Sequence, residues 1–110
     1  TGMEISVAAR YHMNPIVIVL NNSGFGTERP MIDGSFNDVA PWQYHLLPNI
    51  IGTGKGYLIK TEDELAKAFT EVRMSKELSI LEVILDPDDI SPQLQRLCQR
   101  FAQGVKHQEK

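Results

Sequence analysis

The chain alternates short, continuous apolar runs with stretches whose apolar residues recur at helical spacing. The run Ile16–Leu20 is rich in β-branched residues and holds no polar residue. This pattern predicts a central strand of a parallel sheet, covered on both faces. Gly56–Lys60 and Ile80–Leu85 predict two further strands, and the Asp86–Asp89 turn ends the second of these.

Four segments between and around these runs are expected to be helical. The clearest begins with a capping box, in which Thr61 is followed three residues later by Glu64. We expect this helix to run to about Ser75, with its apolar stripe facing the sheet. The stripe consists of Leu65, Ala68, Phe69 and Val72. The other expected helices are Met3–Met13, a short one over Pro41–Leu47 that closes before Pro48, and a last one capped by Ser91-Pro92 with Leu94, Leu97, Cys98 and Phe101 on one face.

Alternating helices and strands predict a three-layer α/β fold, in which helices flank a mostly parallel sheet. Three strands make a small sheet, so we expect a bare face or edge, apolar surface there and self-association. The 110 residues begin at Thr1 without an initiator methionine or a signal-peptide pattern, and no repeat or linker divides them. We interpret residues 1–110 as one incomplete domain, a piece of a longer chain.

Composition and charge exclude several classes of protein. The net charge is −3 and the basic residues are scattered, which argues against a nucleic-acid-binding face. The longest apolar runs are five residues, far below the roughly 20 that a membrane span requires. We therefore expect neither a nucleic-acid nor a membrane partner. Cys98 is the single cysteine and no zinc-ligand spacing occurs, so a cytoplasmic location fits best.

The segment after the first strand holds the candidate chemistry. Asn21-Asn22 ends the strand, and Ser23–Glu28 follows with two glycines. Loops at the carboxyl ends of parallel strands are where α/β sheets bind ligands. Taken alone, an Asn pair in this position is usually only a turn. By the same local reasoning Glu28 would be a solvated residue paired with Arg29, and Phe25 would belong to the core.

The order of strand, Asn pair, Gly24 and Glu28 resembles the end of the cofactor motif of thiamine-diphosphate-dependent 2-keto-acid decarboxylases, such as the pyruvate and indolepyruvate decarboxylases. The Gly-Asp-Gly that opens this motif would fall before Thr1. Acetolactate synthases share the Asn pair, but Glu28 and the later segments favour the decarboxylases. Those segments, which follow the family's order, are Glu28-Arg29, Met31–Gly34, Phe36–Val39, Trp42–Tyr44 and Leu47-Pro48. Thr61–Phe69 is similar to a late helix of the family, although its pattern is generic.

The resemblance implies a cofactor site made of thiamine diphosphate and Mg²⁺. Asn22 would give its side-chain oxygen and Gly24 its backbone carbonyl to the metal ion, which also holds the diphosphate. Such a site suits Mg²⁺, which takes near-octahedral oxygen ligands and commonly completes its shell with phosphate oxygens and water. Phe25, Gly26 and Thr27 would lie against the cofactor. We also expect the two glycines to allow a close approach of the backbone and conformations that other residues avoid.

Glu28 matches the family's catalytic glutamate, which lies near the reacting carbon and handles protons. The implied substrate is a small-molecule 2-keto acid, and the implied full enzyme is a homo-oligomer, a dimer or a tetramer. Because the opening of the motif and the pyrimidine-binding domain are missing, we expect the isolated chain to be inactive. The family commonly has Tyr-Thr-(Ile or Val)-Glu where this chain has Phe25–Glu28, and His where Asp33 stands, so the choice of keto acid stays open.

Other readings of the chain are a free-standing α/β interaction module without catalysis and an acetolactate-synthase-like enzyme. Three weaker patterns favour structural roles. The three histidines, His12, His45 and His107, lie far apart in sequence and favour surface or packing roles. Gly52–Gly56 lacks the spacing of a phosphate-binding loop, and Asp86–Asp89 lacks the pattern of an EF-hand, so both are expected to be turns.

Overall fold

The structure is a computed structural model that describes residues 2–108, with side chains described as far as Phe101. The chain folds into two compact units although no linker separates them. The first unit combines the residues up to Asn21 with Trp42–Ile84, and the second combines Asn22–Pro41 with the residues from Leu85 onward.

The first unit is built on a parallel sheet of three strands in the order β1-β3-β2. The strands are β1 (Ile16–Asn21), β2 (Lys55–Ile59) and β3 (Ser79–Ile84). Both outer strands start level with the middle one, because Ile16 and Lys55 each pair with Ser79. The predicted parallel α/β sheet is confirmed, with each expected strand within one residue of its position.

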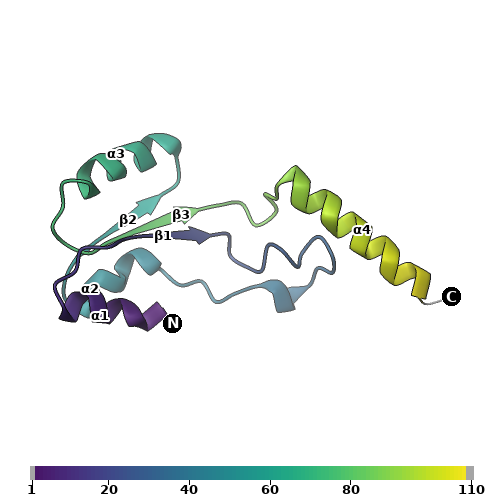
Figure 1. Ribbon diagram of the computed structural model, residues 1–110, viewed down its shortest axis with the longest axis horizontal. Helices are drawn as coiled ribbons and strands as arrows, with labels where there is room; N and C mark the ends of the chain where they lie inside the picture. Colours follow the sequence, from purple (N-terminus) through teal and green to yellow (C-terminus); the bar gives the residue numbers. More distant parts are fainter. Residues whose placement is uncertain (1, 109–110) are drawn as a thin grey trace. The chain divides into compact units, whose positions relative to one another are not determined.

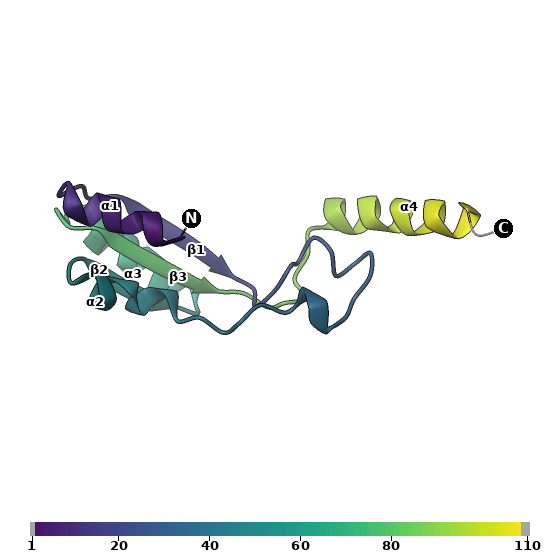
Figure 2. The ribbon, with the colours of Figure 1, turned by 90° about the horizontal axis from the view of Figure 1, so that it is seen from below.

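Helices lie on both faces of this sheet. Helix α3 (Glu62–Val72) covers one face, while α1 (Ile5–Arg10) and α2 (Leu47–Ile51) lie on the other (Figures 1 and 2). Short 3-10 turns over Gly2–Glu4 and Tyr44–Leu46 precede α1 and α2. The unit therefore has the three layers expected from the sequence.

The core under α3 follows from the predicted apolar stripe. Ala68 and Val72 of the helix pack against Ile59 of β2 and Leu81 of β3, and all four are buried. The capping box is present: the Glu64 amide donates to the Thr61 hydroxyl at 3.2 Å, and the Thr61 amide donates to the Glu64 carboxylate. The helix ends at Val72 rather than near Ser75, and a turn over Arg73 and Met74 follows it.

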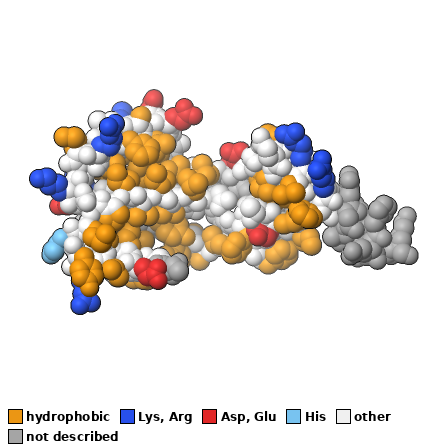
Figure 3. All heavy atoms as spheres, in the orientation of Figure 1, with side chains coloured by type: hydrophobic (Ala, Val, Ile, Leu, Met, Phe, Trp, Pro, Cys, Tyr) orange, Lys and Arg blue, Asp and Glu red, His pale blue; other side chains and the backbone are white. Residues whose placement is uncertain are grey.

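The expectation that β1 is a central strand is wrong for this sheet, in which β3 is central and β1 is an edge. Ile16, Ile18 and Leu20 are 43%, 46% and 66% exposed. Their register places them on the face that α3 covers over β2 and β3. A continuous apolar run shows that both faces of a strand are suited to burial, but it does not show that other elements cover both faces. Hydrophobic side chains gather on the side of this unit that Figure 3 shows. We call the three exposed residues Ile16, Ile18 and Leu20 the β1 stripe.

Two expected helices have different bounds. The short helix placed over Pro41–Leu47 is instead the 3-10 turn Tyr44–Leu46 followed by α2, and Pro48 lies in the first turn of α2. Proline is tolerated there because the first amides of a helix have no partner within it. The helix expected over Met3–Met13 is helical only as far as Arg10, and His12 adopts a left-handed φ of 52°.

The second unit contains an irregular loop and the last helix, α4 (Pro92–Gln108). The Ser91 hydroxyl accepts the Leu94 amide at 3.2 Å, so the predicted cap is confirmed. Of the apolar face expected on α4, Cys98 is buried, but Leu97 and Phe101 are 50% and 57% exposed. The predicted Asp86–Asp89 turn is present, with the Asp89 amide bonded to the Asp86 carbonyl.

Among the described residues, no helix combines the length and the apolar character that crossing a bilayer would require.

Replacing Thr61 with Ala removes the oxygen that caps α3, so the free energy of unfolding should fall by about 1 kcal/mol. Thr70→Ala is the matched control, because the Thr70 hydroxyl only bonds back to the Ala66 carbonyl. That change should be neutral or slightly stabilising, since alanine is the better helix former. Urea unfolding followed by circular dichroism measures both changes, and equal losses would contradict a capping role.

The 110-residue chain should self-associate through the β1 stripe. A lysine in place of Ile18 puts a charge in the middle of the stripe and should shift the chain toward monomer in light scattering. Met74→Lys adds the same charge at an 85% exposed position outside the stripe and should leave association unchanged. A clean monomer for the unmodified chain would contradict the prediction.

Candidate functional site

The loop after β1 is held by a short antiparallel contact with the segment around Asp38. Gly24 and Asp38 face each other in an isolated bridge. The flanking hydrogen bonds run from the Phe25 amide to the Asn37 carbonyl at 2.8 Å and from the Val39 amide to the Ser23 carbonyl at 3.2 Å. In a pair of this kind the facing residues turn their own N–H and C=O groups away from each other. The Gly24 carbonyl therefore points away from the bridge.

Asn22 lies inside the bend of this loop. Its side-chain oxygen accepts the Gly24 amide in a long contact of 3.5 Å. Its side-chain nitrogen lies where a side chain at position 26 would begin, because a Cβ on Gly26 would come within 2.6 Å of it. A side chain at position 26 would therefore collide with the Asn22 amide. The left-handed residue in this loop is Ser23, with φ of 61°, whereas Gly24 and Gly26 are not left-handed, so that part of the expectation is wrong.

Gly24 makes room for the side chain of Arg29. A Cβ at position 24 would lie 2.4 Å from the Asn37 carbonyl and 2.5 Å from the Arg29 guanidinium. Arg29 pairs with Asp33 at 3.0 Å and with Asp38 at 2.6 Å. Hydrogen bonds from Asn37, the Gly34 amide and Arg29 hold the pKa of Asp33 below its ordinary value.

The carboxylate of Glu28 is exposed and accepts a 2.5 Å hydrogen bond from the Thr27 hydroxyl. The pairing of Glu28 with Arg29 that local sequence reasoning suggested is absent from the ion pairs of the described residues, where Arg29 uses Asp33 and Asp38 instead. Phe25 is also 53% exposed, so the reading of it as a core residue is wrong.

A hollow of about 370 Å³ lies within the second unit and gathers most of the predicted site. Five of the six predicted residues line it, all except Glu28. Four more lining residues come from the segment that leads into α4 and from the first turn of α4, and sequence reasoning assigned none of them to the site. The full lining is Asn22, Gly24, Phe25, Gly26, Thr27, Asp89, Ile90, Ser91 and Leu94.

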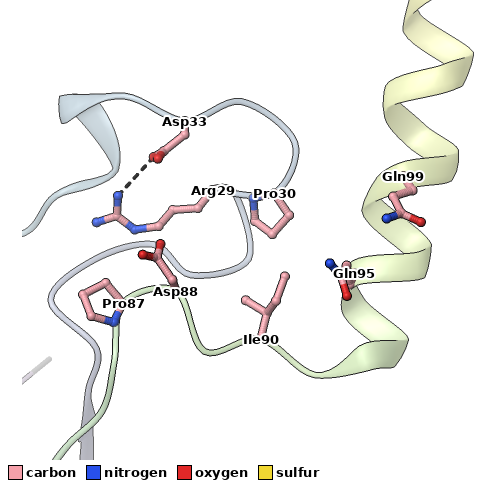
Figure 4. A pocket seen from close by; sticks show the side chains of 8 residues that line it. All are labelled: Arg29, Pro30, Asp33, Pro87, Asp88, Ile90, Gln95 and Gln99. Carbon is pink, nitrogen blue, oxygen red and sulfur yellow. Dashed lines mark hydrogen bonds and ion pairs between the residues drawn. The ribbon is translucent and has the colours of Figure 1, made fainter.

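Arg29 lines a second hollow in the same unit, of about 280 Å³ (Figure 4). Ile90 lines both hollows. Among the described residues, the Nε atom of Arg29 is the buried side-chain nitrogen that lacks a hydrogen-bond partner. The remaining lining residues are Pro30, Asp33, Pro87, Asp88, Gln95 and Gln99.

Sequence reasoning missed a buried polar cluster in the first unit, centred on Glu82. This residue of β3 is 2% exposed. Its carboxylate accepts hydrogen bonds from the Asn21 side chain and from the backbone and ring of His45. Burial alone raises the pKa of Glu82, but the hydrogen bonds from His45 and Asn21 together outweigh it and keep the pKa below its ordinary value. A single acidic residue within the apolar run Ile80–Leu85 was the available signal.

The weaker patterns behave as structural features. His45 packs against Glu82, His12 is exposed, and the side chain of His107 lies outside the described ones. Gly52 and Gly54 have φ of 84° and 94° in the turn between α2 and β2, as expected of a turn. In the part of the chain that the structure describes, no three His, Cys, Asp or Glu side chains gather to hold a metal ion.

Comparison with known proteins identifies the family. Residues 1–83 match the family described as thiamine pyrophosphate enzyme, C-terminal TPP binding domain. The chain belongs to this family of thiamine pyrophosphate enzymes. The matched residues include the whole Asn22–Glu28 segment, whereas α4 and the segment before it lie beyond the match.

Three relatives are longer proteins, each of which matches most of this chain over a small part of its own length. A pyruvate decarboxylase of Aspergillus fumigatus is 36% identical over 96 residues, which cover 81% of this chain and 17% of the relative. A 2-hydroxyacyl-CoA lyase of Oryza sativa subsp. japonica is 36% identical over 98 residues, covering 79% and 17%. Pyruvate decarboxylase 1 of Arabidopsis thaliana is 33% identical over 100 residues, covering 86% and 16%. The chain spans about a sixth of the length of these curated relatives.

Replacing Gly24 with Ala should disrupt the loop, because the new methyl group would collide with the Asn37 carbonyl and the Arg29 guanidinium. We expect a loss of stability of about 1–3 kcal/mol, typical of overpacking. Gly2→Ala is the control, since nothing lies within 4 Å of a Cβ there. Thermal unfolding measures the loss, and amide exchange across residues 22–38 localises it. Equal behaviour of the two variants would contradict the packing described for Gly24.

Proposed function

We propose that the chain forms part of the cofactor site of a thiamine-diphosphate-dependent enzyme that decarboxylates a 2-keto acid. The observation that carries the proposal is the gathering of Asn22, Gly24, Phe25, Gly26 and Thr27 around one hollow, within residues that match the family. Family membership favours this function over a free-standing interaction module. Substrate and assembly belong to the whole protein, and we propose a homo-oligomeric, cytoplasmic enzyme.

Asn22 and Gly24 are the proposed Mg²⁺ ligands. Their donor set suits the ion, because an amide oxygen and a backbone carbonyl are hard, neutral oxygen ligands. The Gly24 carbonyl points away from its bridge with Asp38, and the bare Gly26 leaves space for the Asn22 amide. Neutral ligands leave the charge of the ion to be balanced by the diphosphate. The other ligands would come from the diphosphate, from water and from residues outside this chain.

Glu28 is the proposed acid–base residue. Thiamine diphosphate, when bound, supplies the electron sink that a 2-keto acid needs in order to lose CO₂. The part left to the protein is to place the substrate and to hold or move a proton. The carboxylate of Glu28 is exposed and oriented by the Thr27 hydroxyl, so it is available for this work.

A second function is favoured by one specific observation. The Oryza 2-hydroxyacyl-CoA lyase is as similar to this chain, at 36% identity, as the Aspergillus pyruvate decarboxylase. A lyase that cleaves a 2-hydroxyacyl thioester would use the same cofactor residues and differ in the groups that contact the substrate. Assays with 2-keto acids and with 2-hydroxyacyl-CoA separate the two activities directly.

The cofactor proposal is tested by calorimetry on the full-length protein that contains this chain. Thiamine diphosphate should bind only when Mg²⁺ is present. Asn22→Leu keeps the approximate size of the side chain but removes the oxygen ligand. It should weaken binding by at least about 10-fold, the smaller end of the range for losing even an indirect metal partner.

Asn49→Leu is the matched control, because Asn49 is an exposed residue of α2 outside the loop. It should bind the cofactor like the unmodified protein. Binding that needs no divalent ion, or that survives Asn22→Leu undiminished, would overturn the assignment of Asn22. The same protein with Glu28→Gln should keep its cofactor affinity and lose most of its turnover of the 2-keto acid.

A further inference from the structure

Glu82 is a buried carboxylate whose two oxygens both have partners. Oε1 accepts the Asn21 side-chain amide at 2.7 Å. Oε2 accepts the His45 backbone amide at 3.0 Å and lies 2.5 Å from the His45 ring nitrogen Nδ1. Burying a charged group costs free energy that its partners only partly return, and apolar residues of similar size commonly serve stability as well or better. Stability alone therefore does not account for a glutamate in the middle of β3.

The partners of Glu82 join three parts of the first unit. Glu82 is in register with Val19 of β1 and Leu58 of β2, so its own strand is held from both sides. His45 is pressed against β2, because a Cβ on Gly56 would overlap the His45 carbonyl. From this anchored position the Glu82 side chain reaches two residues beyond its register partner, to Asn21.

Asn21 is the last residue of β1, and the peptide bond after it leads to Asn22. Asn21 points to the same face of the sheet as Glu82, the face opposite α3, because alternate residues of a strand share a face and Val19 pairs with Glu82. Bonding of Asn21 to Glu82 restrains the strand where its ladder of backbone hydrogen bonds ends. A restraint there acts on the residue that follows.

We propose that Glu82 is a positioning residue for Asn22: through Asn21 it fixes the end of β1, from which the proposed metal ligand follows. The inference rests on the proposed function, since it takes Asn22 as a ligand. Mg²⁺ demands near-ideal octahedral geometry, so a ligand whose position is not fixed binds it poorly. Partners that orient a metal ligand indirectly are known to contribute tenfold or more to affinity. Glu82 itself would contact neither the ion nor the substrate.

The test uses the full-length protein and three variants. Glu82→Gln keeps the shape of the side chain but loses one acceptor oxygen. Asn21→Asp sets a carboxylate against the Glu82 carboxylate. The double variant, Asn21→Asp with Glu82→Gln, restores the pair with the donor reversed, because the new amide at position 82 can donate to the new carboxylate at position 21. Ser79→Ala is the control, a buried polar residue at the opposite end of β3 whose hydroxyl bonds only toward Glu77.

Two readouts are compared. The first is the affinity for thiamine diphosphate with Mg²⁺ by calorimetry, which each single variant should lower on the order of tenfold and the double variant should largely restore. The second is amide hydrogen exchange of residues 22–24 in the cofactor-free protein. It should be about fivefold faster in each single variant, as expected for the loss of one hydrogen bond, and near normal in the double variant. Ser79→Ala should change neither readout.

Single variants that bind the cofactor and exchange like the unmodified protein would overturn the inference, as would a double variant no better than the singles. If Glu82→Gln does not fold, Asn21→Asp and Asn21→Ala decide in its place, since each breaks the same hydrogen bond from the less buried side. If the unmodified protein binds no cofactor, the proposed function fails. The exchange readout then still decides whether Glu82 restrains the end of β1.

Discussion

The parallel pairing of β3 with both β1 and β2 is the constraint on which the rest of the structure depends. Because Ile16 and Lys55 both start level with Ser79, the carboxyl ends of the three strands meet at one edge of the sheet. At that edge Asn21 pairs with Ile84. The two segments of the second unit, Asn22–Pro41 and the residues from Leu85 onward, are the continuations of these two paired strands. Segments 63 residues apart in sequence, counted from Asn22 to Leu85, therefore start next to each other and share the lining of one hollow.

Stability and function make different demands on this sheet. The face under α3 is built for stability, with Ile59, Ala68, Val72 and Leu81 buried together. The opposite face buries the carboxylate of Glu82, although apolar side chains of similar size commonly serve stability as well as a buried charge does. This carboxylate accepts one hydrogen bond from Asn21, at the end of β1 where the loop begins, and two from His45. Glu82 itself belongs to the residues that match the cofactor-binding family.

The features of the fold that could be predicted from the sequence are those set by residues close together along the chain. The three strands, the capping box at Thr61 and the cap at Ser91 follow from residues close together in sequence, and all were predicted. The order of the strands was not, because an apolar run such as Ile16–Leu20 does not reveal its neighbours. The pairing of Arg29 with Asp38 and the contribution of Ile90 to the site also escaped sequence reasoning. Both depend on the path that the chain takes through space, which no local sequence pattern specifies. Asn22, Gly24, Phe25, Gly26 and Thr27 were predicted from a motif and line one hollow, while their roles in cofactor binding stay predictions.

Asn22 and Gly24 are the proposed ligands of a metal ion that would hold the diphosphate. The most direct measurement is a crystal structure of the full-length protein with thiamine diphosphate and Mn²⁺ in place of Mg²⁺, using the anomalous signal of manganese to locate the ion. We expect one ion bonded to the Asn22 side-chain oxygen and the Gly24 carbonyl oxygen at about 2.1 Å, close to the Mg²⁺–oxygen distance. An ion that binds the diphosphate while both of these oxygens lie outside its coordination shell would rule out Asn22 and Gly24 as its ligands.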